Sequence, residues 1–315
     1  MTELRRRITS VATIASICLG IFAAAGAGPA WAESPTTPVQ PDLAPLSVSI
    51  TPSYQTDASL DRGGNFSVAR YLFDLSVYQP FSDTFGAGLH LAYEYADFRF
   101  SSPAAFTGTA PWGKVHRLEF GGNVAYDLTP EWSVYVAPSV QFSREEEAGW
   151  GNALAYGGDL TVTRDISPTL TLGAGIEAFN EVERVWALPL VVVNWKITDR
   201  LSLTNPSHPG PAGQTGLELV YRIGGGWEAA AGVSYLSTRF RLNSNGPFRD
   251  GIAETSSIPA WGRLSYKIAR HLDLDVSAGS MFGGNMSIDD RNGNKLVSDD
   301  YAPAPFFSVA FSARF

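Results

Sequence analysis

Apolar residues alternate with polar or small residues along most of the chain after residue 45. In residues 85–95 the odd positions are apolar or aromatic, and residues 46–54, 132–142 and 272–277 follow the same pattern. A period of two predicts β-strands, because successive side chains of a strand point to opposite faces. Runs of about ten residues exceed the ~5–6 of an ordinary strand and match the ~9–11 that cross a bilayer. The pattern therefore predicts an all-β fold, a single antiparallel transmembrane β-barrel over residues 46–315.

The last predicted strand, residues 305–315, has one aromatic face. Phe307, Phe311 and Phe315 share this face with two aliphatic residues, while Ser, Ala and Arg occupy the other. For this stretch alone, an edge strand of a soluble β-sandwich is the alternative. A strand that ends on Phe resembles the assembly signal of bacterial outer-membrane barrels. The resemblance implies that Phe311 and Phe315 are recognised by the barrel-assembly machinery.

Short and long connections alternate along the chain. Six short turns place two apolar residues four positions apart, at residues 81–85, 128–132, 166–170, 197–201, 223–227 and 268–272. Longer polar connections are predicted at residues 57–64, 99–113, 144–152, 181–184, 205–213, 243–256 and 284–302. Outer-membrane barrels have this asymmetry, with short periplasmic turns and longer outer loops. It predicts about fourteen strands, an even number, with both termini periplasmic; twelve is the alternative, because the strands beside residues 205–213 are short.

Aromatic residues are predicted to form two belts at the membrane interfaces. Those that flank the short turns are Phe85, Tyr126, Trp132, Trp195 and Trp227, and those near the long loops are Tyr54, Tyr95, Trp112, Phe142 and Tyr156. The alternative is that aromatic residues are simply common in strands.

The beginning of the chain has the features of a secretory signal peptide. Arginines at positions 5–7 precede an apolar run over residues 11–25, and Ala30-Trp31-Ala32 fits a signal-peptidase site. We therefore expect a signal peptide at residues 1–32 and a Pro-rich periplasmic leader at residues 33–45. Cys18, the only cysteine, would leave with the signal, which excludes disulfides and cysteine ligands from the mature chain.

The chain is acidic, with a formal net charge of −8. This argues against a nucleic-acid partner, because phosphate binding needs a basic surface. The expected partners are outer-membrane lipid and lipopolysaccharide, the barrel-assembly machinery and small solutes.

Over residues 46–315, the alternation, the loop asymmetry and the closing strand resemble the outer-membrane β-barrel proteins of Gram-negative bacteria. The chain is most similar to uncharacterised barrels described as phenol-degradation-pathway-like or as outer-membrane transporters. The resemblance implies a porin-like architecture and a location in the cell outer membrane. It rests on no functional motif, so it implies architecture more strongly than activity.

The inner face of the predicted barrel carries charges of both signs. Alternation directs these charged residues to the lumen: Arg70, Asp74, Glu94, Arg117, Glu119, Asp127, Asp159, Glu177, Glu181, Lys196, Glu218, Arg222, Glu228, Arg263, Lys267, Asp273, Asp275 and Arg314. Such charges are tolerable in a water-filled or internally paired interior and costly on the lipid face. The first interpretation is a passive channel or transporter for small solutes, with a mild preference for cations or neutral solutes. The second is a structural or interaction barrel without a conducting pore, whose interior is held by ion pairs.

Residues 185–197 break the alternation, because both faces are apolar. The side chains expected to face the lumen, or their neighbours if the parity is reversed, are Trp186, Leu188, Leu190 and Val192. Three functional explanations are open: a path for hydrophobic solutes, a surface for an inward-folded loop, or a subunit contact. A bulge at Pro189 that flips the register is the fourth explanation.

The sequence contains no recognisable catalytic or metal-binding arrangement. The four histidines are His90, His116, His208 and His271. They are scattered along the predicted barrel, whereas outer-membrane enzymes usually place a His beside the nucleophile. Residues 284–302 are rich in Asp and Asn, but their spacing does not match a calcium loop, and Asn292-Gly293 is typical of a tight turn. An outer-membrane enzyme is therefore only the third interpretation, and we expect no enzyme, metal or cofactor.

Overall fold

The computed structural model describes residues 45–206 and 215–315, so the expected signal peptide and residues 33–44 of the leader lie outside it. The strands are β1 (Leu46–Ser59), β2 (Asn65–Ser82), β3 (Phe85–Ser101), β4 (Lys114–Thr129), β5 (Trp132–Glu145), β6 (Leu154–Ser167), β7 (Leu170–Glu181), β8 (Arg184–Lys196), β9 (Leu201–Thr204), β10 (Gly216–Gly224), β11 (Trp227–Ser234), β12 (Leu236–Arg241), β13 (Ile252–Ala269), β14 (Leu272–Asp289), β15 (Lys295–Tyr301) and β16 (Ala304–Arg314). Two short 3-10 helices, η1 (Ala104–Phe106) and η2 (Trp150–Ala153), follow β3 and β5. Neither of these described helices is long and apolar enough to cross a membrane.

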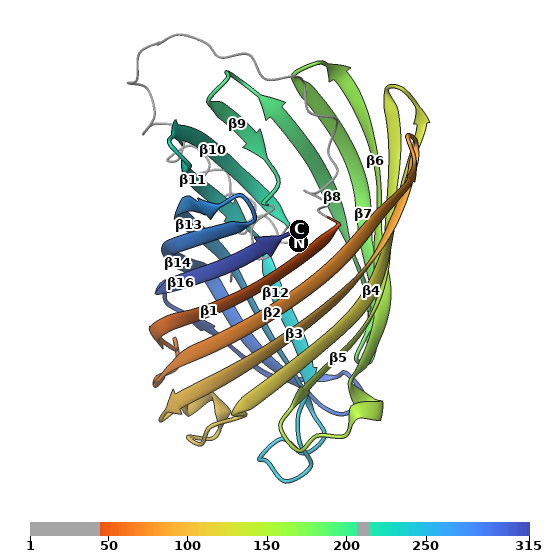
Figure 1. Ribbon diagram of the computed structural model, residues 1–315. Coiled ribbons are helices and arrows are strands. Elements are labelled where there is room, and N and C mark those ends of the chain that lie inside the picture. The colour runs from red at the N-terminus through yellow and green to blue at the C-terminus, as the bar shows by residue number, and fades with distance from the viewer. Residues whose placement is uncertain (1–44, 207–214) are drawn as a thin grey trace. The chain divides into compact units, whose positions relative to one another are not determined.

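Antiparallel pairing runs around the sheet and closes it into a barrel (Figure 1). The ring closes where β1 pairs with β16, with Ile50 opposite Phe311. Because β12 continues β11, and β15 leads into β16, the 16 segments make a barrel of 14 strands. The prediction of one antiparallel barrel with about fourteen strands is confirmed. The weakest part of the wall is β9, which has only 4 residues.

All six predicted short turns join neighbouring strands at one end of the barrel, which we call the turn end. The pairs that close them are Ser82 with Phe85, Thr129 with Trp132, Ser167 with Leu170, Lys196 with Ser202, Gly224 with Trp227 and Ala269 with Leu272. Leu46 and Phe315 also meet at this end, where the Phe315 N–H donates to the Leu46 carbonyl at 2.9 Å. The opposite end, with the other connections, is the loop end.

The loop end contains less irregular chain than the sequence predicted. The connection expected at residues 181–184 is a two-residue turn, in which Val182 and Glu183 have φ values of 35° and 64°. The connection lies where it was predicted, but its predicted length was wrong. Two-residue turns favour Gly, Asn or Asp, and the residues here are Val and Glu, so nothing in the sequence indicated a tight turn. Residues 284–302 were also predicted as a loop, but they form a hairpin of β14 and β15.

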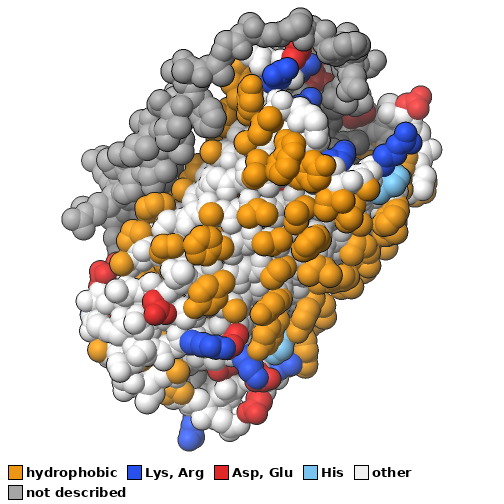
Figure 2. Space-filling view, turned by 60° about the vertical axis from the view of Figure 1, so that its left-hand side comes forward, with side chains coloured by type: hydrophobic (Ala, Val, Ile, Leu, Met, Phe, Trp, Pro, Cys, Tyr) orange, Lys and Arg blue, Asp and Glu red, His pale blue; other side chains and the backbone are white. Residues whose placement is uncertain are grey.

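The outer surface of the wall is apolar. Leu89 and Phe120 are 57% and 56% exposed, while their neighbours His90 and Glu119 lie on the inner face. Figure 2 shows apolar side chains gathered over the wall. This is the surface expected of strands that contact lipid on one side.

Aromatic residues are exposed at the turn end, as predicted. They are Phe85, Tyr126, Trp132, Trp195 and Trp227. Near the loop end, Tyr54 and Tyr156 are also exposed, at 47% and 52%. Trp112 was wrongly assigned to the second belt: it is only 2% exposed, because the loop after β3 folds into the interior.

Four neighbouring strands break or bend at one level near the loop end. The breaks lie at Tyr235 between β11 and β12, at Ser257 in β13, at Gly283 in β14, and at residues 302–303 between β15 and β16. The register makes them neighbours, because Leu236 pairs with Ser257 and Ile258 pairs with Phe282. Beyond this line lies a small sheet that we call the flap, formed by β12, residues 252–256 of β13, residues 284–289 of β14, and β15.

The flap crosses the interior of the barrel instead of continuing its wall. The backbone of Arg241, at the end of β12, forms a parallel β-bridge with that of Arg144 on β5. Phe240 packs against Trp112 with ring centroids 5.5 Å apart. β5 and β12 are far apart around the ring, so β12 has to span the lumen to reach β5. Figure 1 shows β12 inside the ring of wall strands.

Candidate functional site

The inner wall of β2, β3 and β4 carries a ladder of ion pairs. Glu94 lies between two guanidinium groups, 3.4 Å from Arg70 and 3.8 Å from Arg117. Arg117 approaches Glu119 at 4.0 Å, and Glu119 accepts a hydrogen bond from His90 Nε2 at 3.2 Å. These side chains are between 14% and 28% exposed. Alternation placed Arg70, Glu94, Arg117 and Glu119 on the inner face. The structure brings them together with His90 as one partly solvated group.

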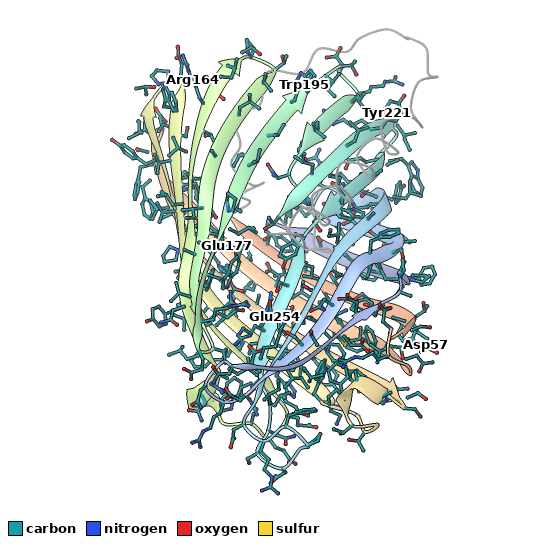
Figure 3. The ribbon with its side chains drawn as sticks, turned by 180° about the vertical axis from the view of Figure 1, so that it is seen from behind. Asp57, Arg164, Glu177, Trp195, Tyr221 and Glu254 are labelled. Carbon is teal, nitrogen blue, oxygen red and sulfur yellow. The ribbon has the colours of Figure 1, made fainter. Side chains whose placement is uncertain are left out.

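A second group on the inner wall is acidic. Asp159 on β6 and Glu177 on β7 are direct register partners, and Figure 3 shows Glu177 on the inside of the wall. Asp74 on β2 is level with Glu119 on β4, because both pair with Ala92. Within the described residues, no ion pair involves Asp74, Asp159 or Glu177, and Asp159 Oδ1 is buried without a hydrogen-bond partner. This part of the inner wall therefore carries excess negative charge.

Arg263 on β13 is the centre of a buried network. Its guanidinium lies 2.8 Å from Glu218, 3.2 Å from Glu228 and 3.5 Å from Asp275. Trp261 Nε1 also donates to Glu218 at 3.1 Å. The side chains of Arg263, Glu218 and Asp275 are only 3%, 3% and 1% exposed. These members of the predicted lumenal set join neighbouring strands by packed side chains and are shielded from solvent.

The other residues predicted for the lumen lie nearer the ends of the wall. Their partners are as follows: Asp273 with Arg314 at 3.9 Å, Glu181 with Arg184 at 3.4 Å, and Asp127 with the Ser133 hydroxyl at 2.6 Å. Lys196, Arg222 and Lys267 are exposed at the turn end.

β8 has apolar side chains on both faces. It pairs with β7 over its whole length without a register shift, so the explanation by a bulge at Pro189 is wrong. Trp186 stacks on Phe179 of β7 with ring centroids 6.2 Å apart. The same face of β8 carries Leu188, Leu190 and Val192. The inner wall thus changes from charged on β2 to β7 to apolar on β8.

One face of the flap is apolar and packs against the wall near β3. The Phe240 ring of β12 lies 6.5 Å from Phe98 and 5.5 Å from Trp112 between centroids. Phe106 of η1 packs against the same Trp at 6.0 Å. Phe240 and Phe106 are fully buried, and Met286 of β14 belongs to the same cluster. The loop after β3 and the flap therefore share one dense core in the mouth of the barrel.

The opposite face of the flap is charged. The Arg239 side chain is 1% exposed and lies 2.8 Å from Asp289 and 3.3 Å from Glu254, both within the flap. Its Nε donates to the carbonyl of Val182 at 3.1 Å. Figure 3 shows Glu254 near the middle of the barrel. This face therefore reaches the tip of the β7–β8 hairpin through side-chain groups.

Two further ion pairs join the flap to this tip. Arg184 lies 2.7 Å from Glu254, and Arg241 lies 3.1 Å from Glu183. Arg241 also donates to the carbonyl of Asn152 at 2.9 Å. The sequence analysis missed Arg239 and Arg241 of β12, although their i, i+2 spacing indicates a charged strand face.

The flap leaves little space beside the ion-pair ladder. A small cavity between the flap and the wall is lined by Arg70, Glu94, Ala96, Phe98, Val115, Arg117, Thr238, Phe240 and Thr255. It has room for about one water molecule. The flap and the wall of β2 to β4 are therefore packed closely at this level.

The three histidines in the described residues lie apart from one another. His90 belongs to the ion-pair ladder, His116 Nδ1 is hydrogen-bonded to the Tyr93 hydroxyl at 2.8 Å, and His271 stacks on Phe315 at 5.8 Å. His208 lies outside the described residues. Across residues 45–206 and 215–315, no group of three or more His, Cys, Asp or Glu could hold a metal ion.

The Asp-rich segment of the β14–β15 hairpin is organised by hydrogen bonds of its own. Asp290 accepts from the backbone N–H groups of Asn292 and Asn294 at 2.8 and 2.9 Å. The hydrogen bond from the Asn294 side chain to Asp290 holds the pKa of this carboxyl below its usual value. Asp289 instead pairs with Arg239. These acidic residues stabilise a turn and the flap.

A closed barrel with an apolar outer face and a charged inner face defines an outer-membrane β-barrel protein. The protein is located in the cell outer membrane. Residues 89–314 match the family described as "Domain of unknown function (DUF6268)", and the chain belongs to this family.

Several solved outer-membrane proteins have a similar fold. An outer membrane channel, COG4313, from Pseudomonas putida F1 is 9% identical, with 88% of this chain and 100% of that chain covered and a TM-score of 0.49. The translocator domain of the autotransporter NalP from Neisseria meningitidis is 8% identical, with coverages of 100% and 98% and a TM-score of 0.37. The Pseudomonas putida toluene transporter TodX is 11% identical, with coverages of 88% and 90% and a TM-score of 0.36. No curated protein matches the sequence.

Proposed function

We propose that the protein is a passive channel for small solutes, with a water-filled, charged lumen between the flap and the turn end. The observation that supports this proposal best is the ion-pair ladder on β2 to β4, whose side chains are 14–28% exposed behind an apolar outer wall. Burying such charges in a dry interior carries a large desolvation cost, whereas water in the lumen solvates them. A water-filled interior is therefore the favoured state.

The acidic group gives the proposed lumen a preference for cations. Asp159 and Glu177 are cross-strand neighbours of like charge, an arrangement that destabilises a sheet unless water and mobile ions screen it. Carboxylates around a pore raise the local concentration of cations and lower that of anions. Small cations and neutral solutes are therefore expected to pass more readily than anions.

We propose that the turn end faces the periplasm. Leu46 and Phe315 both lie there, and short turns face the periplasm in outer-membrane barrels. The expected signal peptide would deliver the chain to that compartment. Phe311 and Phe315 are 49% and 61% exposed, so both rings are accessible to the barrel-assembly machinery. Lipopolysaccharide would then contact the outer wall near the loop end.

Single-channel recording in a planar bilayer tests the channel proposal. The protein is refolded, its folding is verified by heat-modifiable migration in a gel, and the reversal potential is measured under a KCl gradient. Discrete current steps with a reversal potential displaced toward that of K⁺ are expected. A correctly folded barrel that passes no current at any tolerated voltage contradicts the proposal.

A structural barrel without a conducting pore is the second candidate. The buried Arg263 network and the flap across the mouth favour it, because both fill part of the interior. Swelling of liposomes in uncharged sugars of graded size separates the two functions. A channel admits the smaller sugars, whereas a structural barrel admits none.

A further inference from the structure

We propose that the flap is a gate, which opens by releasing its charged face from the β7–β8 hairpin tip and bending along the line of breaks near the loop end. This inference concerns the regulation of the same lumen and rests on the proposed channel function. It is motivated by the mouth itself, where the cavity beside Thr238 and Thr255 has room for about one water molecule. Because β12 crosses the interior, release of the flap would widen the passage through the mouth.

The line of breaks allows the flap to bend as a unit. The pairing of β13 with β14 shifts register between Ser256 and Ile258, and Gly283, opposite this shift, has a φ of 56° that glycine adopts without strain. β11 and β15 end at the same level. Because β11 and β15 end there and the pairing of β13 with β14 is irregular there, the four strands can bend at one level. The bridge between Leu60 and Tyr301 holds the β15 side of the flap to the wall.

The two faces of the flap differ in how easily they can separate from the wall. On the apolar face, Phe240 and Trp112 are 0% and 2% exposed, and moving them into water loses about 25 cal/mol for each Å² of apolar surface. On the charged face, each ion pair to the tip has one partly exposed partner, Arg184 at 37% and Glu183 at 51%. The partner on the flap is less exposed, at 19% for Glu254 and 6% for Arg241. Water can replace ion-pair partners that are partly solvated at small cost. The charged face is therefore the one that releases.

We call the contacts between the flap and the tip the latch. They are Arg184 with Glu254, Arg241 with Glu183, and Arg239 with the Val182 carbonyl. Arg239 keeps two carboxylate partners inside the flap when the latch opens, whereas Arg241, which is 6% exposed in the closed state, exchanges Glu183 for water. The flap then stays packed on the aromatic cluster near β3, and a gap opens beside β8.

Cysteine labelling measures release of the flap without relying on conductance. Ser287→Cys, in a Cys18→Ser background, places a thiol on the charged face of the flap, at a position that is 6% exposed and opposite Glu254 in the register. Adding Glu183→Ala and Arg184→Ala removes both ion pairs of the latch. The rate of maleimide labelling is expected to rise about tenfold, which corresponds to about 1.4 kcal/mol lost from the closed state.

A matched control removes a different ion pair from the same end of the barrel. Lys114 and Glu146 lie 3.3 Å apart, are 47% and 51% exposed, and join β4 to the loop after β5. Lys114→Ala with Glu146→Ala is expected to leave the labelling rate unchanged. Equal acceleration by the two double variants would show that the latch has no special role, and would overturn the proposal.

A cleavable cross-link tests whether this movement controls current. Arg184→Cys with Glu254→Cys, also in the Cys18→Ser background, removes one latch contact and places thiols on both sides of it. Before cross-linking, the channel is expected to be open more often than the wild type. A short bis-maleimide with an internal disulfide should close it, and a reductant should restore the current.

The outcomes separate the gate from the channel. If the wild type conducts but neither the cross-link nor the latch variants change current or labelling, the gate proposal fails and the channel stands. If labelling accelerates while no form of the protein conducts, release of the flap is supported and the channel function fails. Acceleration of labelling together with control of current by the cross-link supports both.

Discussion

Asp159 on β6 stands directly opposite Glu177 on β7 in the antiparallel register. Both are inner-wall positions, and within the described residues neither carboxylate has a basic partner in an ion pair. Direct cross-strand pairs of like charge are unfavourable. Both side chains are only partly buried on the inner face, so water in the lumen can screen their repulsion.

Removing this pair of charges is expected to weaken cation selectivity. Asp159→Asn with Glu177→Gln should lower the cation-to-anion permeability ratio by about twofold or more, since two carboxylates beside the proposed path are lost. The reversal potential under a KCl gradient measures the ratio. Asp199→Asn with Glu131→Gln is the control, because it removes the same charge from residues that are 75% and 64% exposed at the turn end. Equal shifts in the two double variants would contradict a lumenal role for Asp159 and Glu177.

Arg263 is expected to be essential to the stability of the wall. Arg263→Met would leave Glu218 and Asp275, which are 3% and 1% exposed, without their counter-charge. Breaking a buried ion pair in this way costs about 3–5 kcal/mol. Urea unfolding of the barrel in lipid vesicles measures the loss.

Two comparisons distinguish charge burial from a general effect of losing an arginine. Arg164 is 50% exposed and lies 3.7 Å from Glu131, so Arg164→Met should cost about 1 kcal/mol or less. Adding Glu218→Gln and Asp275→Asn to Arg263→Met should recover part of the lost stability. A triple variant no more stable than Arg263→Met alone would contradict the explanation by unpaired charge.

The wall could be predicted from sequence because lipid and lumen impose opposite demands on alternate residues. Leu89 and His90 illustrate this: the first is 57% exposed on the apolar outer face, and the second pairs with Glu119 inside. The same alternation placed Arg70, Glu94 and Arg117 on one face, and their side chains are neighbours in the structure. It could not show which charges pair, because pairing depends on the register between strands, and alternation within one strand is silent about that register.

The flap could not be predicted, because the rule of alternation fails where both faces of a strand are covered. Ile252 and Ala253 are adjacent residues of β13, and both are fully buried. Asp299 and Asp300 made β15 look like part of a polar loop, although Asp299 is only 4% exposed in the hairpin. Trp112 was taken for a membrane-belt residue because sequence cannot distinguish an aromatic side chain facing lipid from one buried in the mouth.

Any side chain at position 283 is expected to lower the stability of the barrel. The φ of Gly283, 56°, lies in the left-handed region, so Gly283→Ala should lower the free energy of unfolding by about 1 kcal/mol. An added Cβ would meet Ile258 at 3.8 Å, an ordinary contact, so the cost is conformational and not steric. Gly113→Ala is the control, because a Cβ there has no neighbour within 4 Å and the φ is not in the left-handed region. Urea unfolding in vesicles should show no loss for the control, and equal effects at the two sites would argue against a strained bend at Gly283.

Phe315 is expected to matter more for assembly than for the stability of the folded barrel. Its backbone exchanges hydrogen bonds of 2.9 and 3.2 Å with Leu46 where the ring of strands closes, and Phe315→Ala keeps both. The ring itself is 61% exposed, so its removal should change the free energy of unfolding by about 1 kcal/mol or less. If the assembly machinery recognises this ring, less Phe315→Ala protein should accumulate in the outer membrane of cells. Phe81→Ala removes a turn-end ring that is 66% exposed, and it should accumulate like the wild type. Equal accumulation of the two variants would show that Phe315 is not part of an assembly signal.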